Sequence, residues 1–117
     1  MHSTYNLQRV IRQEMKQVIW TPIAKESLQH TVDFIQQLWN DQIVEEFLNQ
    51  LDYRITQIRR NPELAPAFSQ SEFRQLLIHK TVSLFYRNYP NYIKLLLIWD
   101  NRQNPAELSQ KLKDANK

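Results

Sequence analysis

The stretch FRQLLIHKTVSLFYRNYPNYIKLLLIWDNRQNP, from Phe73 to Pro105, decides the fold because it alternates strand-forming runs with turn signals. The runs cover residues 73–79, 82–89 and 92–101. The turns are expected between them, at His79-Lys80-Thr81 and Pro90-Asn91. The last run is continuously apolar from Leu95 to Trp99, which is typical of a strand covered on both faces. A three-stranded antiparallel meander is therefore the predicted centre of the fold.

A short strand and two helices are predicted before this meander. Residues 16–20 read as the strand, and Thr21-Pro22 reads as a helix start with Thr as the N-cap and Pro at the first helical position. Asn40-Asp41 separates the two helices, and Asn61-Pro62 ends the second one because the residue before proline avoids helical angles. The apolar stripes are Leu28, Val32, Ile35 and Trp39 in the first helix and Val44, Phe47, Leu48, Leu51, Ile55 and Ile58 in the second.

The order of these elements, β-α-α-β-β-β, predicts an α+β fold in which a helical hairpin packs on a mostly antiparallel sheet. A short final helix is expected from Pro105, because Leu108 and Leu112 lie four residues apart. Residues 16–117 are predicted to form one domain. Residues 1–15 are predicted to be an extension whose role is open: their apolar spacing allows an amphipathic helix, and Met15-Lys16 is an equally good native start.

The composition excludes several classes of site. The chain has no cysteine, so it has no disulfide and no thiolate ligand or nucleophile, which fits the cytoplasm that we expect as its location. It has no glycine, so a phosphate-binding Gly-rich loop is impossible and turns are expected to rely on Asn, Asp, Pro and Ser. No apolar run is long enough to cross a membrane. His30 and His79 lack metal-ligand spacing, so neither a metal nor another cofactor is expected.

The charges divide along the chain. Residues 18–53 hold one base, Lys25, and these six acids: Glu26, Asp33, Asp41, Glu45, Glu46 and Asp52. Residues 54–87 hold two acids, Glu63 and Glu72, and these six bases: Arg54, Arg59, Arg60, Arg74, Lys80 and Arg87. A basic region of this kind suits an anionic partner, and scattered solvated charges are the plainer interpretation.

An ordered set of segments carries a resemblance to a known family. The segments are Thr21-Pro22, Ile58-Arg59-Arg60-Asn61-Pro62, Phe73-Arg74-Gln75-Leu76-Leu77, Leu84-Phe85-Tyr86-Arg87 and Ile98-Trp99-Asp100-Asn101-Arg102-Gln103-Asn104-Pro105. From Lys16 to Leu108 the chain resembles the RelE/ParE superfamily of type II toxin–antitoxin toxins. The resemblance implies this α+β fold, a growth-inhibiting toxin and a cognate antitoxin. It leaves open a homodimer or a hetero-oligomer with the antitoxin.

The resemblance implies two modes of action. Nuclease members cleave mRNA on the ribosome with bases on the sheet and a Tyr or His near the C-terminus. Arg74 and Arg102 match two of the basic positions, but Leu76 and Ser83 stand at two others, and no Tyr or His follows Pro105. ParE-like members bind DNA gyrase instead. We therefore expect a ParE-like binding protein rather than an enzyme; the alternatives are an mRNA endonuclease, with His79 or the ribosome supplying proton transfer, and an inactive family member.

Three arginines are the predicted target-binding residues: Arg74, Arg87 and Arg102. Structural ion pairs, for instance with Glu72 or Asp100, are the alternative interpretation for Arg74 and Arg87. Tyr86, Tyr89 and Tyr92 are expected to pack rather than to stack on nucleic-acid bases. Trp39 and Trp99 are expected in the core.

Overall fold

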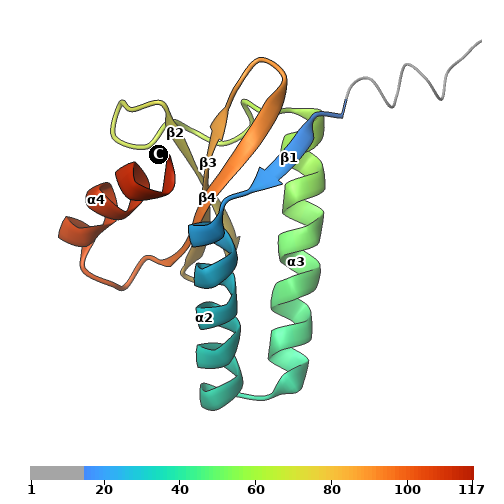
Figure 1. The fold of residues 1–117 in the computed structure, drawn as a ribbon. Coiled ribbons are helices and arrows are strands. Elements are labelled where there is room, and N and C mark those ends of the chain that lie inside the picture. The colour runs from blue at the N-terminus through green and yellow to red at the C-terminus, as the bar shows by residue number, and fades with distance from the viewer. Residues whose placement is uncertain (1–14) are drawn as a thin grey trace, which may run out of the picture.

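The computed structural model describes residues 15–117, which form four strands and three helices (Figure 1). The elements are β1 (Gln17–Trp20), α2 (Pro22–Leu38), α3 (Asp41–Arg60), β2 (Phe73–His79), β3 (Val82–Asn88), β4 (Tyr92–Asp100) and α4 (Pro105–Ala115). This confirms the predicted α+β order of strand, two helices and three strands. The extension predicted at residues 1–15 lies outside the described residues except for Met15.

Side-chain caps fix where each helix begins. Thr21 accepts a hydrogen bond from the backbone N–H of Ala24 at 3.0 Å, and its hydroxyl donates to the carbonyl of Leu95 at 2.9 Å. The first cap therefore joins α2 to the central strand. Asn40 caps α3 through the backbone N–H of Ile43, and Asn104 caps α4 ahead of Pro105. These caps satisfy backbone donors that a helix leaves free at its N-terminus.

The sheet has the strand order β1-β4-β3-β2. β1 pairs with β4 in parallel, whereas β2 with β3 and β3 with β4 are antiparallel. β4 is therefore an inner strand, as its apolar run predicts. A register shift lies between Phe85 and Tyr86, which pair with Leu97 and Leu95 and leave Leu96 as the extra residue of a bulge.

The two faces of the sheet carry separate cores. Leu84, Tyr86 and Leu95 pack with the helical hairpin, whose α2 and α3 lie antiparallel on that face (Figure 1). Phe85, Leu97 and Trp99 pack with α4 on the other face. The apolar run of β4 is thus buried because each face has its own helical cover, and Trp99 is only 4% exposed, as expected for a core residue.

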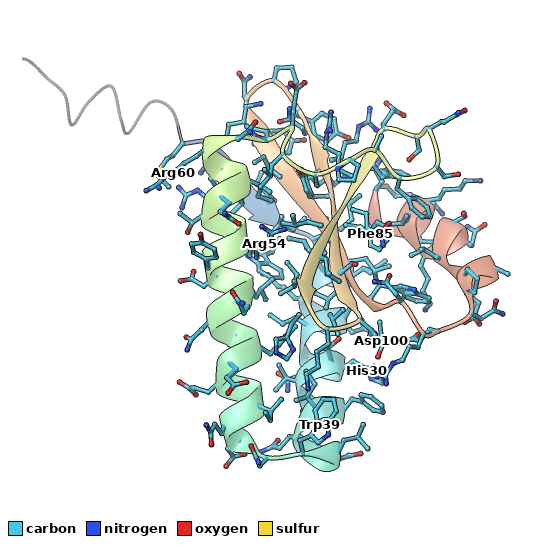
Figure 2. All side chains as sticks on the ribbon, turned by 180° about the vertical axis from the view of Figure 1, so that it is seen from behind. His30, Trp39, Arg54, Arg60, Phe85 and Asp100 are labelled. Atoms are coloured by element: carbon cyan, nitrogen blue, oxygen red, sulfur yellow. The ribbon has the colours of Figure 1, made fainter. Side chains whose placement is uncertain are left out.

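Two predictions of buried apolar residues are wrong. Trp39 is 46% exposed, and Leu48 is also exposed. Trp39 follows α2 at the tip of the hairpin, which extends past the sheet (Figures 1 and 2), so little lies there to cover its ring. Leu48 is next to the buried Phe47, and a step of one residue turns a side chain away from the stripe.

The chain turns at Lys80-Thr81 and Pro90-Asn91 as expected, but two left-handed positions use residues other than the expected Asn, Asp, Pro and Ser. Positive φ angles occur at Ser69, Gln70 and Lys80, with values of 50°, 58° and 51°. Gln and Lys thus occupy left-handed positions where Gly or Asn is usual. Lys80 lies at the tip of the β2–β3 hairpin, which directs its side chain toward the tip of α2. Among residues 15–117, no helix has the length and apolarity needed to cross a membrane.

Candidate functional site

Arg102 lies in the loop that follows β4 and forms an ion pair with Asp100. The Arg102 Nε lies 3.1 Å from Oδ1 of Asp100, and a terminal guanidinium nitrogen lies 2.7 Å from Oδ2. The hydrogen bond from the Arg102 side chain is the main reason why the pKa of the Asp100 carboxyl lies below its ordinary value. More than half of the Arg102 side chain is still exposed, so it can also reach a partner.

Arg87 is held among side chains at the opposite end of β3. Its guanidinium forms an ion pair with Glu72 and lies 4.6 Å from the centre of the Tyr89 ring. Tyr89 stacks on Tyr92 with 4.9 Å between ring centres. This arrangement matches the expected packing role of these tyrosines and the alternative interpretation of Arg87 as one half of an ion pair.

Arg74 is tied to the loop between α3 and β2. It donates a hydrogen bond of 2.6 Å to the carbonyl of Ala65, and its guanidinium lies 3.9 Å from the carboxylate of Glu63. Tyr86, which is fully buried, holds the same loop through a 2.8 Å hydrogen bond to the carbonyl of Pro62. Arg74 therefore stabilises the loop, and its ion-pair partner is neither of the two considered from the sequence.

The strand register keeps the three predicted arginines apart. Arg74 pairs with Tyr86 and shares its face under the helical hairpin, whereas Arg87 pairs with Phe73 on the face covered by α4. Arg102 follows Asp100, which pairs with Val82 at the start of β3. Val82 lies five residues from Arg87 along this strand, so the two are roughly 17 Å apart at ~3.3 Å per residue. Arg74, Arg87 and Arg102 therefore form no single surface.

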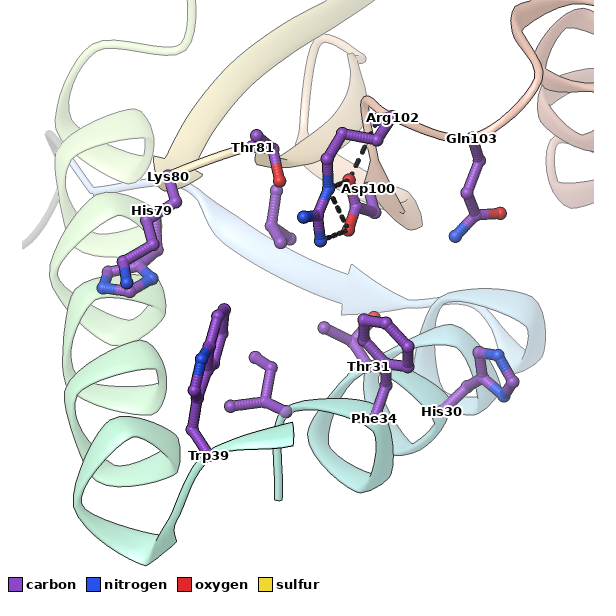
Figure 3. Close-up of a pocket in the computed structure, with 12 residues that line it drawn as sticks. His30, Thr31, Phe34, Trp39, His79, Lys80, Thr81, Asp100, Arg102 and Gln103 are labelled. Atoms are coloured by element: carbon purple, nitrogen blue, oxygen red, sulfur yellow. Dashed lines mark hydrogen bonds and ion pairs between the residues drawn. The ribbon is translucent and has the colours of Figure 1, made fainter. Parts of the chain in front are cut away.

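A cleft of about 420 Å³ lies between the tip of the hairpin and the end of the sheet (Figure 3). Arg102 and Asp100 lie on one side of it, and Phe34 and Trp39 lie on the other. The remaining polar lining residues are His30, Thr31, His79, Lys80, Thr81 and Gln103. We name this hollow the tip cleft.

The tip cleft contains residues that the sequence did not single out as a site. The Lys80 ammonium lies 4.6 Å from the centre of the Trp39 ring, although 41 residues separate them in the chain. His79 also lines the cleft, and its ring contacts Phe47 edge-on with 6.4 Å between ring centres. Of the residues proposed for a nuclease, the cleft unites His79 with Arg102 but not with Arg74. The residues of the tip cleft come together because the turn between β2 and β3 contacts the end of α2, which is far away in the chain.

A second hollow of about 520 Å³ adjoins the first between α2, β4 and α4, and shares His30, Thr31 and Gln103 with it. Its charged lining residues are Glu26, Lys111 and Asp114. It carries two acids and one base, so its charge balance is opposite to that of the tip cleft.

Comparison with known proteins finds similarity in structure but not in sequence. No protein-family model matches the sequence, and no curated protein matches it. A solved structure described as the chromosomal ParDE TA system from P. aeruginosa superposes with a TM-score of 0.62 at 17% sequence identity. The match covers 73% of this chain and 95% of that one. The two chains share a fold.

That fold is the helical hairpin on a mostly antiparallel sheet that the RelE/ParE resemblance implies. The structure also shows the surroundings of Leu76 and Ser83, the two positions that the resemblance matches to bases of nuclease members. Leu76 is buried in the core under the hairpin. Ser83 is 1% exposed, and its hydroxyl accepts hydrogen bonds from Asn101 at 2.8 Å and Gln75 at 3.3 Å. Neither position presents a cation to a phosphate.

Proposed function

We propose that this chain is the toxin of a type II toxin–antitoxin system, that it acts by binding a large target, and that DNA gyrase is this target. The fold shared with a ParDE system supports the toxin role. The separation of Arg74, Arg87 and Arg102 supports target binding over catalysis, and it is the observation that carries the proposal. A phosphoryl-transfer site needs several cations converging on one phosphate, and these three do not converge.

An mRNA endonuclease is the second candidate, favoured by one observation. His79 and Arg102 line the same cleft, so a proton acceptor and a cation lie near each other. Of the three predicted arginines, however, only Arg102 lines this cleft, and Leu76 and Ser83 supply no further charge. The site therefore has fewer cations than nuclease members of the family use, and we rank this function below target binding.

A cognate antitoxin is the partner we propose for the outer surface of the hairpin. Leu38, Leu48 and Tyr53 are exposed large apolar side chains on α2 and α3. An amphipathic segment of the antitoxin would cover them, and its acidic residues would meet the exposed basic side chains near the sheet. A hetero-oligomer with the antitoxin and a homodimer of the toxin are both compatible with this surface.

Expression of the chain from a tightly controlled promoter, without an antitoxin, tests the proposed function. Filamentous cells with double-strand DNA breaks are expected, together with inhibition of supercoiling by purified gyrase in vitro. Rapid loss of translation with cleaved mRNA would instead establish the endonuclease. Normal growth at a verified protein level would identify an inactive family member and would contradict both active functions.

Alanine variants of Arg74, Arg87 and Arg102 then locate the target surface. We expect Arg102→Ala to relieve toxicity with the fold intact, because Arg102 is the most exposed of the three. Lys113→Ala is the matched control, since Lys113 is an exposed base in the last turn of α4. Full toxicity of Arg102→Ala would remove Arg102 from the target-binding surface.

A further inference from the structure

The tip cleft has the size and lining of a small-molecule site. Its volume of about 420 Å³ lies in the usual range for such sites, roughly 300–1,000 Å³. Phe34 and Trp39 are 44% and 46% exposed, and both belong to the cleft lining (Figure 3). Two large rings left open to solvent in one hollow favour a ligand with a flat apolar surface.

The charges of the cleft favour an anion. Lys80 and Arg102 are its two permanent cations, and Asp100 is the one carboxylate in its lining. Both oxygens of Asp100 already accept hydrogen bonds from Arg102, so the carboxylate is occupied. Within residues 15–117, the Lys80 ammonium forms no hydrogen bond or ion pair, and it lies 4.6 Å from the centre of the Trp39 ring. Lys80 is therefore a cationic donor available to a ligand.

The turn between β2 and β3 places Lys80 at the tip of their hairpin. Its φ of 51° places a side chain with a Cβ in a left-handed turn position that glycine occupies more easily. This conformation brings the ammonium to 4.6 Å from the centre of the Trp39 ring. A ring stacked near Trp39 would thus have its charged substituent close to Lys80, and Arg102 lines the same cleft.

From these contacts we propose that the tip cleft binds a small aromatic anion, with its ring against Trp39 and Phe34 and its carboxylate or phosphate between Lys80 and Arg102. Such a ligand combines stacking with charge-assisted hydrogen bonds, and each part alone would bind weakly. The proposal does not depend on the toxin role, because binding is measured on the purified chain.

Phenyl phosphate, benzoate, benzyl alcohol and inorganic phosphate are the probes that separate these contributions. Each is titrated into the isotope-labelled full chain while two-dimensional ¹H–¹⁵N NMR follows the indole N–H of Trp39. The chain has three tryptophans, and the Trp39 signal is assigned by its loss in Trp39→Phe. We expect saturable shifts with phenyl phosphate or benzoate, and binding at least ~10-fold weaker for the neutral ring and for the free ion. Comparison of the two aromatic anions distinguishes a phosphate from a carboxylate ligand.

Lys80→Gln and Lys113→Gln form the decisive pair of variants, because each removes one exposed ammonium. Lys80→Gln should weaken binding by about tenfold, and Lys113→Gln should leave it unchanged. Equal binding of benzyl alcohol, equal weakening by Lys113→Gln, or no saturable shift with either anion would overturn the proposal. A well-dispersed spectrum of each variant shows that the fold is retained, so lost binding is attributed to the cleft.

Discussion

The two tryptophans that the sequence places in the core should differ in their contribution to stability. Trp99 is 4% exposed and packs between β4 and α4, whereas Trp39 is 46% exposed at the tip of the hairpin. Trp99→Ala leaves a cavity in a closed core, and such changes cost about 3–5 kcal/mol. Trp39→Ala opens onto solvent, so no cavity term is added.

The cost of Trp39→Ala can be worked from its surroundings. Full burial of a large apolar side chain contributes about 1.5–3 kcal/mol, and roughly half of that applies to a half-exposed ring. Loss of the contact with the Lys80 ammonium adds about 0.5–1 kcal/mol. The expected total is about 1.3–2.5 kcal/mol. At ~4 °C per kcal/mol for a domain of this size, Tm should fall by about 5–10 °C for Trp39→Ala and about 12–20 °C for Trp99→Ala.

Urea unfolding followed by far-UV circular dichroism measures both losses without relying on tryptophan fluorescence. The m-values of the variants must match that of the parent chain, since only then do shifts in the midpoint report stability. Equal losses of 3 kcal/mol or more in both variants would contradict the reasoning. Such a result would mean that Trp39 is covered in solution, as its place in the apolar stripe predicts.

Two further predictions concern pH. The hydrogen bonds of Arg102 lower the pKa of Asp100, so the stability from this pair is present above the ordinary aspartate pKa and is lost as the pH falls through the lowered folded value. Between about pH 5 and pH 2, the urea midpoint of Arg102→Ala should therefore decline less steeply than that of the parent chain. An unchanged slope would show that the pair forms no lasting hydrogen bond. Burial is the main cause that raises the pKa of Tyr86, so the stability it contributes is present below about pH 10 and is lost as the pH rises from there through the raised folded value. Tyr86→Phe should remove that alkaline loss and cost about 1–2 kcal/mol at neutral pH, because the Pro62 carbonyl loses its donor; a variant as stable as the parent at neutral pH would contradict this role.

Local sequence signals predicted the elements of the fold well. Thr21-Pro22, Asn40-Asp41 and Pro105 mark the helix starts in the sequence, and the caps Thr21, Asn40 and Asn104 each accept a hydrogen bond from the first turn of their own helix. The three strands of the meander also follow their apolar runs closely. The burial of Trp39 was mispredicted because periodicity defines a stripe along a helix but not how far the covering sheet extends. Burial depends on that distant partner.

The candidate site was harder to predict because it depends on strand register and on contacts between turns. A difference of one position in register moves a side chain to the other face of a sheet, and this separates Arg74 from Arg87 although both lie in the basic region. The opposite holds for Lys80 and Trp39, which lie far apart in the chain and meet because the hairpin of β2 and β3 ends above the tip of α2. A basic segment in the sequence therefore need not form a basic face. The charges available to a ligand are those that the fold brings to one hollow, and in this chain they are Lys80 and Arg102.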